Sequence, residues 1–528
     1  MHSKEVEVLI VGAGPAGLMM ACQLAIHQVS FRIIDIKDTS LKSSGALIVQ
    51  ARSLEIFEQM GIAVEAITDG IIADKVNIIF SGEKTTSTNI KDIGITLSQF
   101  PFLLMLEQSK TEKLLLKFMD ARGLNVERGV LFKSFVQDKE EVTSIVVLPD
   151  GSEQSIKTKY VIAADGTNST IRNFLNIPFN GKTYAKPIFI LDCKAKTELV
   201  SGEISFAFSN SSIAGFFPLQ DSRWRIDSTI SNEMESFENI TFDDIAKDFR
   251  LRTKINIAFQ ESEWFSVTHS HQKYAGYIRV QNCFLVGDSA HINTPIGAQG
   301  MNTGLQDAYN LAWKLAFVIK HKAKQELLST YSTERLGISK AFAHYADVVF
   351  RGVTNDNPIV KFFRLYVLRG LLKILFPFVE KRKFYRQMFF KSISQIGIHY
   401  RESILSYQVV DNAFHRNTPR PGDRLPFIEF FYEDRNTNSY EILDVARFNL
   451  IIFADVLPYK IVEIAEKYNL AVVLIINRPV TRKVYELFGI ISKGYYLIRP
   501  DMHLSLRSAT MNTHHLNIYL QQLLIVQQ

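Results

Sequence analysis

A glycine-rich turn near the start of the chain constrains its fold more than any other feature. The stretch from Gly12 to Gly17 reads Gly-Ala-Gly-Pro-Ala-Gly and lies between an apolar run, Glu5 to Val11, and a helix-forming run, Pro15 to His27. A second apolar run, Phe31 to Ile36, follows. Strand, turn, helix and strand within so short a segment predict a doubly wound α/β domain with parallel strands.

The glycines of this turn have separate physical tasks. Gly12 permits the tight turn, Gly14 lets backbone N–H groups approach a pyrophosphate, and Gly17 allows close packing of the helix on the sheet. The helix N-terminus attracts the anion. Asp35 closes the next strand, where a carboxylate can accept hydrogen bonds from ribose hydroxyls. The motif predicts dinucleotide binding but does not by itself separate NAD from FAD.

Two later glycine motifs fit the same kind of site. Asp165-Gly166 follows a strand-like run that ends at Ala164, and Gly287-Asp288 follows another that ends at Val286. A glycine-rich segment then leads into a helix predicted over 302–319. An acid at a strand end can hold a ribityl hydroxyl, and the positive end of the helix would stabilise a reduced, anionic flavin. Asp-Gly alone is also common in ordinary turns, so the last motif, Gly287-Asp288 with the helix that follows it, is the stronger evidence for a flavin site.

In this order and at these distances, the three motifs resemble those of the class A flavoprotein monooxygenases, the FAD-dependent aromatic hydroxylases. Ala51 to Phe57, Gln108 with Glu112, and Phe217 to Leu219 with Arg225 are similar to further segments of that family. Near the C-terminus, Gly422 to Arg424 and Ile498 to Ser508 resemble the thioredoxin-like domain of the phenol-hydroxylase branch.

The resemblance implies an α/β fold with an FAD-binding Rossmann-like (doubly wound) domain formed discontinuously by 1–180 and 278–345. An antiparallel-sheet substrate-binding domain is expected at 181–277, a helical segment at 346–410 and a thioredoxin-like domain at 411–528. The residues expected to bind the cofactor are Gly12, Gly14, Pro15, Ala16, Gly17, Asp35, Arg52, Gln108, Asp165, Gly166, Gly287, Asp288, Pro295, Gly297, Ala298, Gly300, Met301 and Asn302. No catalytic base and no metal site is identified.

The resemblance also implies an activity. FAD would be reduced by NAD(P)H as a transient co-substrate, O₂ would add at the flavin C4a atom, and the hydroperoxide would hydroxylate a small aromatic compound, phenolic or polyketide-like. Epoxidase, reductase or oxidase activity on the same fold, and a non-catalytic flavin-binding scaffold, stay open as alternatives. The sequence leaves the substrate, the choice of NADH or NADPH, and a homodimeric state undecided.

Three departures from the family pattern bear on this expectation. Gly45 and Ala46 stand where the family has an Arg-Ala pair, so a cation expected near the cofactor phosphates is missing unless Lys42 supplies it. Ala298 adds a methyl group where the family has glycine. No cysteine follows Cys283, so the C-terminal domain has no dithiol and is expected to be structural.

Composition supports a folded protein, and the concentration of basic charge in one segment, described below, argues against a nucleic-acid-binding role. The 528 residues are 47% hydrophobic and 22% charged, which fits neither a disordered chain nor a polytopic membrane protein. Cys22, Cys193 and Cys283 are far apart and favour reduced thiols in the cytoplasm. Residues 181–280 are rich in aromatic side chains, which are expected mainly in the core: Phe189, Phe206, Phe208, Phe216, Phe217 and Trp224. For Phe206, Phe208 and Phe217 a role in lining a substrate pocket stays open.

The net charge of +6 is concentrated in one segment. Between Arg351 and Glu402 the chain has 11 Lys and Arg against 3 Asp and Glu, and helices broken near Pro377 are expected there. A basic amphipathic pattern in this segment fits either a membrane surface or packing onto neighbouring domains with a solvated basic face. The second interpretation is favoured, so membrane association is not expected. The residues of the pattern are Arg364, Leu365, Leu368, Arg369, Leu372, Lys373 and Leu375.

Overall fold

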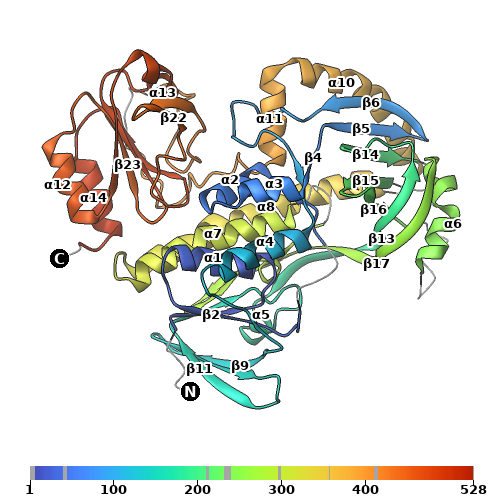
Figure 1. Cartoon of the computed structure of the whole chain (residues 1–528), viewed down its shortest axis with the longest axis horizontal. Helices are drawn as coiled ribbons and strands as arrows, with labels where there is room; N and C mark the ends of the chain where they lie inside the picture. Colours follow the sequence, from blue (N-terminus) through green and yellow to red (C-terminus); the bar gives the residue numbers. More distant parts are fainter. Residues whose placement is uncertain are drawn as a thin grey trace.

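The computed structural model describes residues 6–39, 45–209, 213–230, 240–294, 299–355, 357–409 and 414–526. A central region of parallel sheet and helices lies between an eight-stranded sheet and a C-terminal α/β unit (Figure 1). Within the described ranges, no helix has the length and apolar composition required to cross a lipid bilayer.

The central sheet has the predicted parallel core. Its strand order is β18-β19-β12-β1-β2-β8, and β1 pairs in parallel with both β2 and β12. Strands β1, β12 and β19 are buried at every position, because they are apolar on both faces and helices or sheet cover both sides. The bounds are β1 Val8–Val11, β2 Phe31–Asp35, β8 Glu127–Arg128, β12 Tyr160–Ala163, β18 Arg279–Val280 and β19 Cys283–Leu285.

Helix α1 (Pro15–Ile26) packs between α4 (Gln108–Asp120) and α7 (Gly300–Ile319) on this sheet. The predicted strand-turn-helix unit and the later helix are therefore confirmed. The other elements of the region are α2 Ala51–Gln59, α3 Ala63–Asp69 and α5 Thr170–Phe174, the three-stranded sheet of β9 Leu131–Gln137, β10 Val142–Val147 and β11 Glu153–Thr158, and the short strands β3 Ile48–Val49, β4 Ile71–Ile72 and β7 Leu104–Met105.

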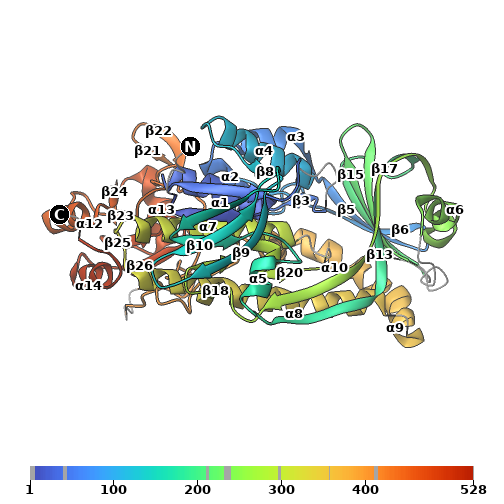
Figure 2. The ribbon, with the colours of Figure 1, turned by 90° about the horizontal axis from the view of Figure 1, so that it is seen from below.

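The eight-stranded sheet has the order β20-β17-β13-β16-β15-β14-β5-β6 and is antiparallel except for the pair β14 and β5. Two of its strands, β5 and β6, come from residues 75–89, far from the others in sequence. Figure 2 shows the long pair β13 and β17 running from this sheet toward the centre of the molecule. The bounds are β5 Lys75–Phe80, β6 Glu83–Asn89, β13 Phe179–Thr197, β14 Glu203–Phe208, β15 Ile213–Leu219, β16 Arg223–Thr229, β17 Ile257–Ala275 and β20 His291–Ile292, with helix α6 Phe242–Thr253.

Period-two alternation divides the side chains of this sheet between its two faces. Phe216, Trp224 and Ile226 face α6 and pack in one cluster with Phe249. Their neighbours in sequence, including Phe217 and Arg225, point to the opposite face and line a cavity. The aromatic side chains of the region therefore serve both as core and as cavity wall.

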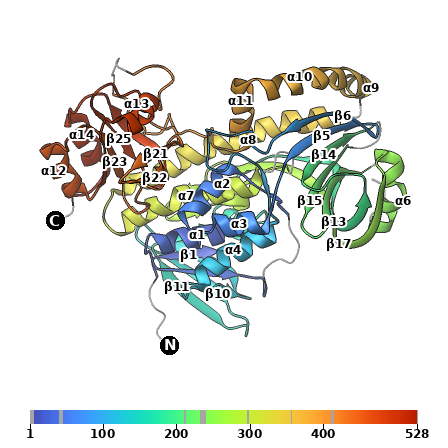
Figure 3. The same cartoon turned by 45° about the horizontal axis from the view of Figure 1, so that its top comes forward.

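Helix α8 and the helices after it connect the central region to the C-terminal unit, and α10 and α11 lie at the outer margin of the molecule (Figure 3). The break predicted near Pro377 is wrong, because α10 continues through this residue. Pro377 is exposed, so water can replace the hydrogen bond that its ring removes, and the chain leaves the helix only at Arg382. The bounds are α8 Ser329–Thr354, α9 Pro358–Phe362, a π-helical stretch Phe363–Leu368, α10 Arg369–Lys381 and α11 Lys383–Ile393.

The C-terminal unit contains a four-stranded sheet in the order β24-β23-β25-β26. Strand β23 is parallel to β24 and antiparallel to β25. The sequence predicts strands in the runs Phe448 to Phe453, Ala471 to Ile476, Tyr495 to Ile498 and Leu504 to Arg507, and all four are confirmed. The bounds are β21 Glu429–Tyr432, β22 Arg435–Asn438, β23 Asn449–Phe453, α12 Tyr459–Tyr468, β24 Ala471–Ile475, α13 Arg482–Phe488, β25 Gly494–Ile498, β26 Leu504–Ser508 and α14 His514–Leu523.

A buried ionic cluster joins this unit to α7 and α8. Arg499 donates two hydrogen bonds to Glu334, at 2.6 and 2.9 Å, and also pairs with Asp501. Lys314 of α7 contacts the same Glu334 at 2.6 Å. Burial acts to raise the pKa of Glu334, but the attraction of Arg499 and Lys314 outweighs it and lowers that pKa to about 2.

The cluster predicts a large cost for removing its cation. Arg499→Met should lower the free energy of unfolding by about 3–5 kcal/mol, measured by chemical denaturation, because Asp501 would stay buried without its guanidinium partner and Glu334 would keep only Lys314. The matched control is Arg482→Met, which breaks the exposed pair with Glu486 and should cost under about 1 kcal/mol. Equal stability of the two variants would contradict the structural role of the cluster.

Candidate active site

A cavity of about 670 Å³ lies between the carboxyl ends of the central parallel strands and the eight-stranded sheet. Its central wall consists of the turn after β1, the turn after β12 and the turn after β19. Its opposite wall comes from β13, β15, β16 and β17. The predicted residues that line it are Gly12, Gly14, Pro15, Ala16, Asp35, Gln108, Asp165, Gly166, Gly287, Asp288, Gly300 and Met301.

The glycine turn after β1 is held by backbone contacts that no larger residue allows. Gly12 has φ +102°, and a Cβ atom there would lie 2.2 Å from the carbonyl oxygen of Ala164. A Cβ on Gly17 would lie 1.9 Å from the carbonyl oxygen of Gly12. Gly14, by contrast, has no described heavy atom within 4 Å of such a Cβ and lines the cavity. Gly12 and Gly17 therefore shape the turn, and Gly14 leaves space open above it.

The start of helix α1 is suited to bind an anion. Its N-cap residue is Gly14, no side chain caps its first N–H groups, and its first turn has no acidic residue. These N–H groups carry the positive end of the helix dipole. Asp35 lies beside the turn and accepts a 2.7 Å hydrogen bond from the Ala13 N–H. Asp35 thus stabilises the turn and also lines the cavity.

Asp288 projects into the cavity from the turn after β19. Its side chain is exposed to the cavity, and among the described residues none donates a hydrogen bond to its carboxylate. The surrounding protein partly desolvates the carboxylate and raises its pKa, although His291 opposes this effect. Asp165 is similar, since its Oδ1 is buried without a partner among the described residues and burial raises its pKa. Two carboxyl groups with unused acceptor capacity therefore face the cavity.

The loop that carries Asp288 is fixed by Asp307 of α7. Asp307 accepts hydrogen bonds from the Gly287 N–H at 3.1 Å and from Arg335 at 2.7 Å, and it pairs with His291 at 2.6 Å. Burial acts to raise the pKa of Asp307, but His291 and Arg335 lower it overall. The sequence did not single out this group.

Three predicted residues lie outside the cavity lining. Gly17 is buried beneath the turn. Arg52 pairs with Glu55 and donates a 2.8 Å hydrogen bond to the Asp501 carbonyl, so it faces the C-terminal unit. Asn302 accepts a 2.9 Å hydrogen bond from the Gln50 N–H and holds the segment before α2. The predicted residues Pro295, Gly297 and Ala298, and also Lys42, lie outside the described residues.

The eight-stranded sheet contributes an ionic group that sequence reasoning largely missed. Arg225 of β16 is almost fully buried and makes a bidentate pair with Asp192 at 2.5 and 2.7 Å. Its third nitrogen donates a 3.2 Å hydrogen bond to the Gly45 carbonyl. A cation therefore lies next to the position where the sequence lacks the expected arginine.

Asp227, two residues further along the same strand, also lines the cavity. Its Oδ1 is buried and has no partner among the described residues. Burial raises its pKa to about 6, although Arg225 acts in the opposite direction. The available sequence signal was a strand with apolar Trp224 and Ile226 on one face and charged Arg225 and Asp227 on the other.

The geometry fits a dinucleotide cofactor with a second ligand beside it. An open glycine turn at an uncapped helix N-terminus suits a pyrophosphate, and the carboxyl groups of Asp35 and Asp288 suit sugar or ribityl hydroxyls. On the opposite wall, Ile188, Ile190 and Phe217 form an apolar part beside the ionic group, and polar residues of β17 and of the segment after β20 form the rest. This combination is typical of a buried site for an apolar or aromatic ligand.

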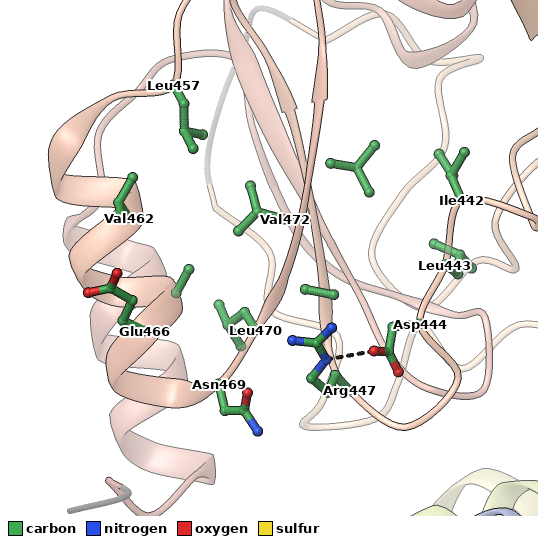
Figure 4. A pocket seen from close by; sticks show the side chains of 13 residues that line it. Ile442, Leu443, Asp444, Arg447, Leu457, Val462, Glu466, Asn469, Leu470 and Val472 are labelled. Carbon is green, nitrogen blue, oxygen red and sulfur yellow. Dashed lines mark hydrogen bonds and ion pairs between the residues drawn. The ribbon is translucent and has the colours of Figure 1, made fainter. Parts of the chain in front are cut away.

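Another hollow, of about 630 Å³, lies in the C-terminal unit (Figure 4). Apolar side chains such as Leu457 and Val472 line it, and Arg447 pairs with Asp444 at 2.6 Å at its edge. None of the predicted site residues lies there. Within the part of the chain that the structure describes, no group of three or more His, Cys, Asp or Glu residues could hold a metal ion.

Comparison with known proteins identifies the family. The family model described as an FAD binding domain matches residues 5–346. The 6-methylpretetramide 4-monooxygenase of Streptomyces rimosus is 28% identical over 98% of this chain and 93% of its own length. The pentachlorophenol 4-monooxygenase of Sphingobium chlorophenolicum is 30% identical over 64% of this chain and 63% of its own.

The fold agrees as well. The anhydrotetracycline hydroxylase from Streptomyces rimosus superposes with a TM-score of 0.79 at 23% identity, covering 98% of this chain and 99% of that one. The chain thus belongs to the FAD-binding family of class A flavoprotein aromatic monooxygenases.

The glycine turn yields a test that separates folding from cofactor binding. Gly14→Ala should leave the stability of the apoprotein unchanged, because its methyl group meets no described atom, yet weaken FAD binding about tenfold or more by occupying the space above the turn. Gly17→Ala should destabilise the apoprotein itself by about 1–3 kcal/mol through overpacking. Fluorescence titration with FAD and thermal denaturation measure the two effects. Unchanged FAD affinity in Gly14→Ala would place the pyrophosphate elsewhere.

Proposed function

We propose that the chain is a monooxygenase that consumes NAD(P)H and O₂ and hydroxylates an aromatic compound, phenolic or polyketide-like, with FAD as its cofactor. One observation carries the proposal. A single cavity joins the three glycine turns to the apolar and ionic face of the eight-stranded sheet. A cofactor held by the turns would therefore lie next to a ligand held by the sheet. A 6-methylpretetramide 4-monooxygenase and a pentachlorophenol 4-monooxygenase are among the relatives.

The division into domains is part of this proposal. FAD would be held by 1–180 with 278–345, with 181–277 as the substrate-binding part, 346–410 as the helical segment and 411–528 as a thioredoxin-like domain. The strand order β24-β23-β25-β26, with one parallel and two antiparallel pairs, supports the last assignment. The buried, free thiols of Cys22, Cys193 and Cys283 support the cytoplasmic setting.

The bound flavin would supply the redox chemistry, accepting electrons from NAD(P)H and activating O₂. The protein would orient the cofactor through the predicted contacts and exclude water through the walls of the cavity. Arg225, fixed by Asp192 and adjacent to Gly45, would supply the positive charge that the missing arginine of the family pattern provides. Because Asp192 holds this guanidinium at two points, its position is set before any ligand binds.

Asp227 is the group best placed to move a proton on the substrate. Its unpartnered Oδ1 can accept a hydrogen bond from a ring hydroxyl, and a pKa of about 6 makes it an ionised base at neutral pH that is easily protonated. Removal of the phenolic proton makes the ring more electron-rich, which favours attack on an electrophilic oxygen.

This role predicts a specific pH dependence. Below about pH 6 the Asp227 carboxyl would be protonated, so kcat should fall as the pH is lowered through this value. Asp227→Asn should lower kcat at neutral pH by about 10²–10⁴-fold and remove that limb of the profile, with FAD content unchanged. A profile that keeps the same inflection in the variant would assign the base to another residue.

The overall proposal is tested with the purified holoprotein. It should contain one FAD per chain, and a suitable aromatic compound should accelerate NAD(P)H oxidation and acquire one atom of ¹⁸O from ¹⁸O₂. Asp288→Ala should lower FAD occupancy through the loss of a charged acceptor, an effect of roughly 1.5–3 kcal/mol, whereas Asp120→Ala on the exposed end of α4 should not. Hydrogen peroxide as the sole oxygen product across a broad aromatic panel would favour the oxidase or scaffold alternatives.

A further inference from the structure

Exposed apolar side chains are concentrated on the helices of residues 357–393. Of the 32 large hydrophobic residues that are exposed in the described part of the chain, 13 lie between Ile359 and Phe389. We call these 13 residues the outer stripe. They are Ile359, Phe362, Phe363, Tyr366, Val367, Leu371, Ile374, Leu375, Phe378, Phe384, Tyr385, Met388 and Phe389. Such a concentration of apolar surface marks an interaction site.

The outer stripe is opposite the face by which these helices pack. Leu365, Leu372 and Phe376 face inward and contact a cluster of apolar side chains from β5 and β14, including Phe80 and Phe208. On the outer side, members of the stripe recur every three or four residues from Phe362 to Phe378, which is the spacing of one helix face. The helix formed by α9, the π-helical stretch and α10 is therefore apolar on two faces, and only one is covered.

The stripe continues onto α11 across the turn at Arg382. The ring centroids of Phe378 and Tyr385 are 5.1 Å apart, and those of Phe384 and Tyr385 are 5.4 Å apart. Figures 1 and 3 place α10 and α11 at the margin of the molecule, with no described element on their outer side. The contacts among Phe378, Tyr385 and Phe384 therefore join the part of the stripe on α10 to the part on α11.

The same segment is strongly basic. Residues 357–393 contain nine Lys and Arg and one acidic residue, Glu380. Some of these cations are used within the protein, such as Arg369, which pairs with Glu83 at 2.8 Å. Lys373, Lys381 and Lys383 are exposed and form no ion pair with any described residue. The outer stripe is thus accompanied by uncompensated positive charge.

The inner face packs on neighbouring elements and several lysines are solvated, as expected, but two residues of the predicted pattern lie on other faces. Arg364 is buried rather than exposed, and Leu375 is 39% exposed rather than packed inward. The π-helical stretch at Phe363–Leu368 changes the helical phase, so the spacing assumed from the sequence places these residues on the wrong faces. Water therefore meets rings and aliphatic side chains in addition to the charge that the sequence pattern predicted.

The charge selects the occupant of this surface. In a symmetric dimer formed through the stripe, each basic patch would face an identical basic patch, which is electrostatically unfavourable. The surface of an anionic bilayer offers opposite charge to the lysines and an apolar phase to the aromatic rings. We propose that the outer stripe with its lysines binds peripherally to membranes rich in anionic lipid.

The proposal is tested by flotation of the full-length holoprotein with lipid vesicles. The protein should float with vesicles of phosphatidylcholine in which a third of the lipid is phosphatidylglycerol, and much less with phosphatidylcholine alone. High salt should weaken the binding, because it screens the charges. Failure to bind the anionic vesicles, or equal binding to both kinds, would overturn the proposal.

Two pairs of variants separate the apolar and ionic contributions. Ile374→Ser should reduce binding, whereas Ile491→Ser, at an equally exposed apolar site elsewhere, should not. Lys381→Glu combined with Lys383→Glu should reduce binding about tenfold or more, whereas the same two reversals at Lys139 and Lys493 should not. FAD content and circular dichroism must match the wild type in each variant.

Two results would reject the membrane as the occupant. One is equal loss of binding in the stripe variants and their controls, which would indicate a diffuse charge effect. The other is a stable dimer in sedimentation equilibrium that Ile374→Ser dissociates, because the stripe would then be covered by a second copy. Vesicle binding does not depend on turnover, so failure of the proposed hydroxylase activity would leave this test intact.

Discussion

Helix α7 carries buried polar and charged side chains along its length, and each must find a partner from another part of the chain. Asn302 holds the segment before α2, Asp307 holds the turn after β19, and Lys314 joins the cluster around Glu334 and Arg499. An unpaired charge at such a depth costs several kcal/mol, so Asp307 and Lys314 each need the partner that the fold supplies. They fix the central sheet, α8 and the C-terminal unit in one arrangement.

This arrangement positions the cavity. Asp307 orders the turn that presents Asp288, while the strands of the second sheet bring Arg225 and Asp227 to the opposite wall. The cofactor wall is mainly backbone and carboxylate, and the other wall combines an apolar part with a few polar side chains and one ionic group. The separation of roles has a physical basis, because a cofactor needs fixed hydrogen-bonding groups, whereas an aromatic ligand needs a dry surface with few polar anchors.

The sequence predicted much of this correctly for local reasons. The glycine turn, the parallel core strands and the strands of the C-terminal unit follow from runs of residues that lie within a few positions of one another. It did not place Arg52, whose partners include the distant Asp501, and it did not find Asp227. The partner of Arg52 is hundreds of residues away, and no local spacing reports it. Alternation along β16 places Asp227 on the face of Arg225, but only the tertiary structure shows that a cavity lies there.

The sequence by itself determined the family, the dinucleotide turn and the order of strands and helices, because each is encoded by local periodicity and by glycines that permit no side chain. Only the tertiary structure decided which faces are covered. Strands β5 and β6 join a sheet formed by much later residues, and the π-helical stretch rotates an apolar stripe outward. Long-range packing decides which side chains are buried and which are exposed, and the local pattern does not contain this information. The raised pKa of Asp227 and the exposure of Phe378 both depend on it.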